Sequence, residues 1–209
     1  MTDATWVEAQ FTRSDGAFRF ARWGRPLAPV IVGTDDAGCR IFEDGISHVA
    51  TVAGHQITEL DPELGANFLV FLVNDWAELH EAPNLVRLIP NLADLVEHLG
   101  AHDANQYRVF NVDPGGAICL CISLIRYDAE MQQVSAQTLA VNVAFQGMLL
   151  WSDLAFREES PFGMTDDGLC LIKPGFARLL RAAYDPVLPA AAVDASLALR
   201  LTARMAADR

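Results

Sequence analysis

Basic residues are scarce in this chain of 209 residues. Lys and Arg together number 15, whereas Asp and Glu number 27, so the formal net charge is −12. An acidic chain repels phosphate groups, which argues against a nucleic-acid partner and against binding to an anionic membrane surface. The sequence therefore favours neither of these two classes of partner.

Long apolar segments are absent as well. A helix needs roughly 18 apolar residues to cross a bilayer. The longest apolar run, GGAICLCISLI (115–125), is shorter and is followed by Arg126, so it fits a buried strand. The first residues, MTDATWVEAQFTRSDG, lack the basic stretch and apolar run of a secretory signal. We therefore expect a cytoplasmic protein without a membrane partner.

Motifs for common cofactors and nucleophiles are missing. The chain has neither Gly-x-Gly-x-x-Gly, nor a P-loop, nor Gly-x-Ser-x-Gly. Its four cysteines form no CxxC motif and no Cys/His pair with zinc spacing. We expect these cysteines to be buried, reduced thiols, and we expect no cofactor.

What the chain does have is a globular composition, with 52% hydrophobic residues. Hydrophobic alternation and turn residues predict strands at 18–23, 28–33, 55–60 and 67–73 and a β-hairpin over 106–127. Helical spacing predicts helices at about 36–53, 92–100, 129–150, 174–184 and 190–207, with a long loop at 152–168. This order predicts an α+β fold, with a single mixed β-sheet covered by helices. We expect one domain over 1–209, with a core at about 17–188 and a C-terminal helical extension at about 189–209.

Several short segments, in order along most of the chain, carry a resemblance. They are FARWGRP (20–26), GHQIT (54–58), GANFLVFL (65–72), SLIRYDAEM (123–131), AFQGMLLWSD (144–153), MTDDG (164–168) and LLRAAYDPVL (179–188). Together they resemble a bacterial domain family of unknown function with a zincin-like, that is metallopeptidase-like, helix. That family has a run of the type His-Glu-Glu-x-x-Gln-Gly-Leu-Gly-Leu-x-Asn-Asp. The resemblance implies a zincin-like core.

The chain departs from the family at the positions that would carry metal chemistry. The His-Glu-Glu positions fall on Val141, Asn142 and Val143, and no His or Glu lies between Met131 and Arg157. A zincin site needs two helix side chains that hold Zn²⁺ and an adjacent Glu that activates water. Valine cannot bind a metal, and asparagine cannot act as a general base at neutral pH. The resemblance thus implies the fold and argues against the activity.

Polar residues of the 129–150 helix are the candidate binding residues. Asn142 and Gln146 lie four apart and share a helix face, and Asp153 follows at the helix exit. One interpretation is the polar remnant of a cleft, beside this helix and under the 152–168 loop. The other is purely structural: the two amides bond to a neighbouring loop, and Asp153 caps a turn.

A weaker metal hypothesis rests on two histidines. His98 and His102 have the i, i+4 spacing of a helical ligand pair, but Gly100 between them weakens the helix. The alternative is that both are solvated residues at a helix end.

Three functional hypotheses follow. The first is a non-catalytic, degenerate metallopeptidase-like domain whose cleft binds a peptide or protein partner, with strand addition at a sheet edge as one mode. The second is a metal-dependent hydrolase or peptidase that uses a non-standard site. The third is a structural or assembly protein.

Overall fold

A mixed four-stranded sheet forms the centre of the molecule. The computed structural model describes residues 3–82, 84–165 and 170–207. The strand order is β2-β3-β5-β4. The first three strands are mutually parallel and β4 is antiparallel to β5. The strands are β2 (Pro29–Val32), β3 (Phe68–Val73), β4 (Gln106–Val112) and β5 (Ile118–Arg126). The α+β class and the mixed sheet predicted from the sequence are confirmed.

The two central strands are apolar because both of their faces are covered. Phe68 and Val70 of β3 belong to one core cluster, whereas Leu69 and Phe71 belong to the cluster on the opposite face. β5 alternates in the same way from Leu120 to Ile125. A strand buried on both faces is a continuous apolar run rather than an alternating one, which explains the pattern of these two segments.

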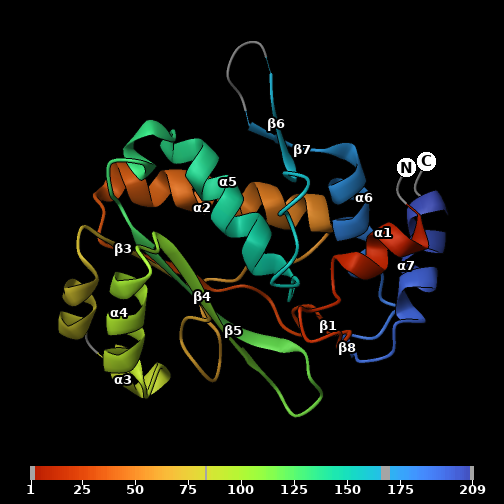
Figure 1. Cartoon of the computed structure of the whole chain (residues 1–209), viewed down its shortest axis with the longest axis horizontal. Coiled ribbons are helices and arrows are strands. Elements are labelled where there is room, and N and C mark those ends of the chain that lie inside the picture. The colour runs from red at the N-terminus through yellow and green to blue at the C-terminus, as the bar shows by residue number, and fades with distance from the viewer. Residues whose placement is uncertain (1–2, 83, 166–169, 208–209) are drawn as a thin grey trace.

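Two long helices cover the first face of the sheet (Figure 1). They are α2 (Asp36–Ala53) and α5 (Ala136–Met148). Asp35 caps the start of α2, and Gly54 ends it at φ 67°, a left-handed conformation that glycine adopts without strain. The helices approach closely where Gly45 faces Ala140, since a Cβ at position 45 would lie 2.8 Å from that of Ala140.

The opposite face is covered by three short helical segments. They are η1 (Trp76–Glu81), α3 (Leu85–Leu88) and α4 (Leu92–Ala101), with a 3-10 conformation in η1. A capping box between Asp75 and Glu78 starts η1. Their buried leucines pack on the second core cluster.

The chain ends pack beside the sheet. They contribute α1 (Ala4–Ala9), α6 (Pro174–Ala183) and α7 (Leu197–Ala207), together with the two-residue ribbon of β1 (Phe20–Ala21) and β8 (Ala191–Ala192). Leu197, Leu201 and Met205 of α7 are buried in the same core cluster as α2 and α5, so this stripe packs on its own chain. In Figure 1 both ends of the chain lie on the same side of the molecule.

Two predicted strands are wrong or much shorter. Segment 18–23 has only the two residues of β1 in a ribbon, and residues 55–60 form no strand, apart from an isolated bridge between Ile57 and Leu27. Alternation alone predicted these strands. The segment before β3 instead closes a turn in which Asp61 and Gly65 exchange backbone hydrogen bonds.

Three other boundaries differ from the prediction. The helix expected from 129 begins at Ala136, because Ser135 caps it and a 3-10 turn, η2 (Met131–Gln133), precedes it. The expected loop contains a strand, β6 (Phe162–Met164), which pairs with β7 (Cys170–Ile172). The last helix begins at Leu197 instead of 190. None of the described helices is both long and apolar enough to span a membrane.

Candidate functional site

Asn142 and Gln146 lie together on α5, as their spacing predicted. The side-chain amide of Gln146 donates a hydrogen bond to Oδ1 of Asn142, and both residues are half-buried. This bond uses one of the two amide hydrogens of Gln146. No other bond involves either side chain within the described part of the chain, so most of their hydrogen-bonding capacity is unused.

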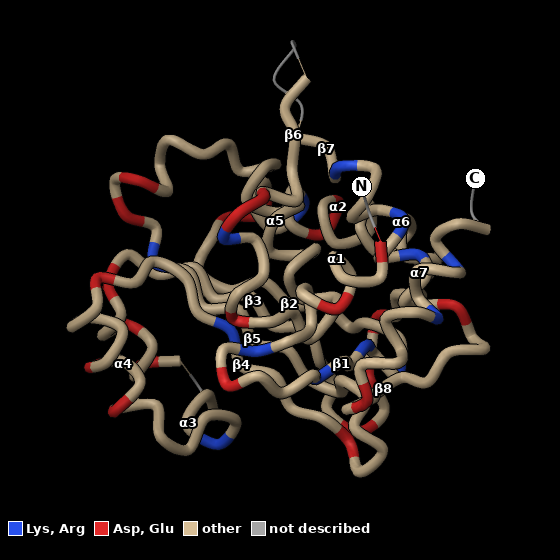
Figure 2. The backbone as a smooth tube through the Cα atoms, turned by 45° about the vertical axis from the view of Figure 1, so that its right-hand side comes forward, with Lys and Arg blue, Asp and Glu red and all other residues tan. Residues whose placement is uncertain are grey.

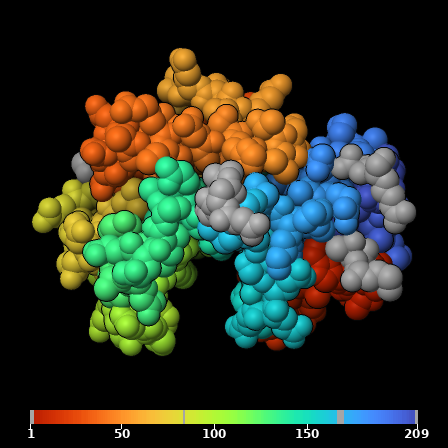
Figure 3. Space-filling view, turned by 90° about the horizontal axis from the view of Figure 1, so that it is seen from above, coloured from red at the N-terminus to blue at the C-terminus, as the bar shows by residue number. Residues whose placement is uncertain are grey.

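The helix periodicity shows which flank of α5 carries this pair. Ala140 faces α2, and Gly147 faces the sheet at Phe68. At 100° per residue, Ala140 and Gly147 point in nearly the same direction, about 20° apart. Asn142 and Gln146 lie roughly 200° and 240° round the helix from Ala140, so they are turned away from both contacts. Figure 3 shows that the surface is hollowed on this side of α5, between the segments around 125–140 and 150–160.

Arg108 on β4 is a charged residue that sequence analysis missed. It stands opposite Ser123 of β5, whose hydroxyl lies 3.9 Å from Sγ of Cys121. Cys121 belongs to the core cluster under α2 and α5 and lies beneath Gly147. Directly opposite residues of an antiparallel pair share a face, so the Arg108 side chain lies on the α5 side of the sheet.

The environment of Arg108 is poor in polar partners. Its Nη2 donates to Oε1 of Gln106 at 3.3 Å, while its buried Nε has no partner among the described residues. Burial lowers the pKa of Arg108 from its usual value, and the thiol of Cys121 works in the opposite direction. Since a guanidinium does not lose its proton in a protein, Arg108 keeps its positive charge in a half-buried position.

Asp153 is occupied by a structural contact. Its Oδ1 accepts a hydrogen bond from the backbone N–H of Ser14 at 3.0 Å. The side-chain and backbone hydrogen bonds of Ser14 hold the pKa of Asp153 below its ordinary value. Asp153 is exposed and fastens the start of the long loop to the N-terminal turn, a long-range contact rather than the local turn cap of the structural interpretation.

His98 and His102 lie close together at the end of α4. Their ring centroids are 4.1 Å apart, and Nδ1 of His102 lies 2.9 Å from the carbonyl oxygen of His98. Both residues are exposed. Within residues 3–82, 84–165 and 170–207, no group of three His, Cys, Asp or Glu side chains is arranged to hold a metal ion. Of the MTDDG segment, positions 166–168 lie outside the described residues.

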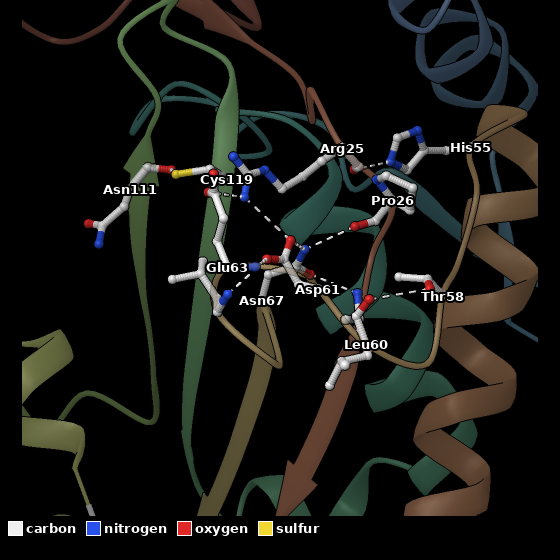
Figure 4. Close-up of polar contacts among 12 residues, drawn as sticks. Arg25, Pro26, His55, Thr58, Leu60, Asp61, Glu63, Asn67, Asn111 and Cys119 are labelled. Carbon is white, nitrogen blue, oxygen red and sulfur yellow. Dashed lines mark hydrogen bonds and ion pairs between the residues drawn. The ribbon is translucent and has the colours of Figure 1, made fainter.

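A polar cluster at the amino end of the parallel strands is fully bonded (Figure 4). Oδ1 of buried Asp61 accepts two backbone N–H groups, and its Oδ2 accepts from Asn67 at 2.9 Å and from Arg25 at 3.4 Å. Burial raises the pKa of Asp61, but these hydrogen bonds and the guanidinium of Arg25 outweigh it, so the pKa is lowered. Asn67 also bonds the backbone of Pro26 and Ala28. With its bonds satisfied internally, the cluster fixes the strand entries.

The expectation that all four cysteines are buried is wrong, since only Cys121 is buried and Cys39, Cys119 and Cys170 are half-buried. Neither of the thiols on β5, Cys119 and Cys121, is a ready nucleophile. Burial raises the pKa of Cys121 to about 12, although Arg108 and Ser123 act to lower it. Burial also raises the pKa of Cys119, whose Sγ lies 3.4 Å from the carbonyl oxygen of Asn111. A thiol must lose its proton to attack, so these two residues do not support nucleophilic catalysis.

A second hollow lies elsewhere on the surface. It has a volume of about 690 Å³ and lies between α1 and segment 154–159 of the long loop. Trp6 and Phe176 contribute to its apolar lining. Asn142, Gln146 and Asp153 do not line it, so this hollow is separate from the face of α5 that carries the two amides.

Comparison of the chain with protein-family models, with curated proteins and with solved structures gave no match.

Proposed function

We propose that this protein is a non-catalytic binding module that takes up an extended segment of a peptide or protein partner at the free edge of β4. In this mode of recognition a peptide adds a strand to a sheet, and its backbone hydrogen bonds supply the affinity. The observation that carries the proposal is the outward direction of three backbone units on β4.

The pairing of β4 with β5 identifies these units. The N–H of Arg126 donates to the carbonyl oxygen of Asn105 at 2.9 Å, so positions 105 and 126 form a hydrogen-bonded pair. Hydrogen-bonded and non-hydrogen-bonded pairs alternate along an antiparallel ladder. The N–H and C=O groups of Gln106, Arg108 and Phe110 therefore point away from β5. No strand in the described part of the chain pairs with this edge.

The two edges of the sheet differ as docking surfaces. β2 has four residues and begins with Pro29, which cannot donate a hydrogen bond. β4 has seven residues, contains no proline, and carries a bulge between Asn111 and Val112 at its far end. Its length and its unblocked centre make β4 the better template for an added strand.

The non-catalytic part of the proposal rests on the side chains near α5. Val143 is buried, and Asn142 bonds to Gln146, so these positions offer amides rather than metal ligands or a base. We extend the zincin-like resemblance to a degenerate core in which α5 is the counterpart of the motif helix. The four cysteines are free, which supports a reducing compartment, and we place the protein in the cytoplasm.

The proposal is tested with the full chain immobilised and exposed to a pool of N-acetylated hexapeptides of randomised sequence. The blocking variant is Gln106→Pro. It removes an outward N–H but no bond to β5. Its matched control is Gln106→Ala, which removes the same side chain and keeps the N–H. We expect peptides retained by the wild type and by Gln106→Ala to be lost from Gln106→Pro.

Two outcomes would overturn the proposal. One is equal retention by the proline and alanine variants, which would place any peptide site away from β4. The other is the absence of retained peptide together with a stable dimer that Gln106→Pro dissociates. That result would assign the edge of β4 to assembly with a second copy.

A further inference from the structure

A small pocket opens at the carboxyl ends of the parallel strands. It has a volume of about 220 Å³. It is lined by the segments in which β2, β3 and β5 end and by the first turns of α2 and α5. None of its lining residues within the described part of the chain belongs to β4. The pocket is therefore separate from the sheet edge that is proposed for strand addition.

The chain leaves two neighbouring strands toward opposite faces of the sheet at this pocket. β2 leads into α2, whose Phe42 belongs to the core cluster on the first face. β3 pairs with β2 and leads into η1, whose Trp76 belongs to the cluster on the opposite face. Where neighbouring parallel strands diverge in this way, a crevice remains outside their carboxyl ends, and ligands of open parallel sheets bind there. The pocket occupies this crevice.

Backbone contacts hold the ends of the three strands together. The N–H of Tyr127 donates to the carbonyl oxygen of Val73 at 2.7 Å, which fixes the exit of β5 against the end of β3. A Cβ at Gly33 would collide with the carbonyl oxygen of Leu72, and the φ of Gly33 is 92°. Only glycine therefore lets the exit of β2 pass so close to β3. The mouth of the pocket is thus built from the backbone and is preformed.

Three polar side chains line the pocket and are available for hydrogen bonds. They are the hydroxyl of Thr34, the amide of Asn74 and the phenol of Tyr127. The backbone N–H of Asn74 is bound by Glu78 at 3.2 Å, but none of the three side chains bonds to another described residue. All three residues are exposed, so a ligand would replace water at these groups.

The rest of the lining is apolar and uncharged. Phe42, Leu72, Val73 and Leu139 contribute to it, and no Asp, Glu, Lys or Arg lines the pocket among the described residues. A cation would lose hydration there without gaining an ion pair. The net charge of −12, with acidic residues spread over helices and loops (Figure 2), disfavours an anion. The lining therefore suits a neutral ligand.

We infer that this pocket binds a small uncharged molecule with a compact apolar body and an amide-like hydrogen-bonding edge. The body packs on Phe42 and Leu139, and the edge faces Thr34, Asn74 and Tyr127. A hydroxyl or an amide both donates and accepts, so these groups match an edge that has a donor beside an acceptor. The volume lies below the range of about 300–1,000 Å³ for pockets of drug-sized ligands, so a single ring with one planar substituent is the fitting size.

The test is a titration of the full chain with benzamide, benzoate and benzamidine. These probes share one ring and a planar substituent of the same shape, and they are neutral, anionic and cationic in that order. The NMR signals of the backbone amides of Gly33 and Gly38 report binding, and that of Gly100 on α4 is the internal control. We expect benzamide to shift the first two signals only and to bind about tenfold more tightly than either charged probe.

Two substitutions test the polar groups of the lining. Tyr127→Phe should weaken benzamide binding about threefold or more, whereas Tyr107→Phe, at a similarly exposed tyrosine of β4, should not. Asn74→Asp places a carboxylate in the lining, so it should weaken benzamide binding and strengthen benzamidine binding. Asn91→Asp makes the same change of charge at an exposed position before α4, and it should leave both affinities unchanged.

Three outcomes would overturn the inference. The first is that no signal of Gly33 or Gly38 shifts at benzamide concentrations near the solubility limit. The second is that a charged probe binds as tightly as benzamide does. The third is that neither Tyr127→Phe nor Asn74→Asp changes the affinity for benzamide. Because the pocket is separate from β4, Gln106→Pro should bind benzamide as the wild type does, so this site and strand addition stand or fall independently.

Discussion

Arg108 of β4 faces Ser123 of β5 as a non-hydrogen-bonded antiparallel pair, on the face of the sheet that α5 covers. Arg108 joins an outward-facing backbone unit to a half-buried side chain on this face. The proposed strand addition would use the backbone unit.

Replacement of Arg108 should not destabilise the protein. Arg108→Met keeps an apolar stem and removes a half-buried charge, so we expect the free energy of unfolding to stay unchanged or to rise by about 1 kcal/mol. Denaturant unfolding of wild type and variant measures this difference. A decrease of more than about 1 kcal/mol would mean that an internal interaction stabilises Arg108.

The C-terminal end of α5 depends on aromatic hydrogen-bond donors. The hydroxyl of Tyr184 donates to the carbonyl oxygen of Met148 at 2.7 Å, and Nε1 of Trp23 donates to that of Gly147 at 2.8 Å. Tyr184→Phe leaves one of these carbonyl groups unsatisfied, so we expect a loss of about 1–2 kcal/mol in unfolding free energy. Tyr107→Phe, at an exposed position, is the control and should change little. Equal effects of the two variants would contradict the capping role.

Two helical glycines should respond oppositely to alanine. A Cβ at Gly147 would lie 2.6 Å from ring atoms of Phe68. We therefore expect Gly147→Ala to overpack the core and to lower the free energy of unfolding by about 1–3 kcal/mol, and the melting temperature with it. At Gly100 of α4 a Cβ meets nothing within 4 Å, and Gly100→Ala should stabilise by up to about 1 kcal/mol. Thermal unfolding of both variants, compared with the wild type, measures the two effects. A neutral Gly147→Ala would show that α5 does not pack so closely on β3.

Acid should destabilise the protein through His55. Burial, followed by the nearby guanidinium of Arg22, lowers the pKa of His55, while its contact with the carbonyl oxygen of Arg25 acts oppositely. The unfolded chain then binds a proton at a higher pH than the folded chain does. The free energy of unfolding should therefore fall as the pH drops below about 6.5. In His55→Gln, which keeps the other four histidines, the slope should be smaller; an identical slope would contradict this assignment.

The strength of the local signals decides how much of the fold could be predicted. The apolar runs of β3 and β5 and the turn at 113–116 identified the centre of the sheet and the β4–β5 hairpin. The alternation at 55–60 failed because a strand also needs a neighbour with free backbone groups. Here the adjoining turn is organised by Asp61, which binds Glu63, Leu64 and Asn67 nearby and Arg25 from 36 positions upstream.

The candidate site could be predicted only in part. Helical spacing brought Asn142 and Gln146 together, and their mutual hydrogen bond agrees with it. In QYRVFNV, however, Arg108 has the alternating surroundings of an ordinary strand residue. That it has no ion pair among the described residues depends on long-range packing, which no local pattern records.

Hydrogen exchange at the backbone amides of β4 tests the central claim most directly. In the free protein the amides of Gln106, Arg108 and Phe110 should exchange rapidly, whereas those of Tyr107 and Val109 are protected by β5. Addition of the pool of N-acetylated randomised hexapeptides should slow the first three amides in the wild type, and should not slow those of Arg108 and Phe110 in Gln106→Pro. Unchanged exchange of these three amides in the wild type would contradict strand addition at β4.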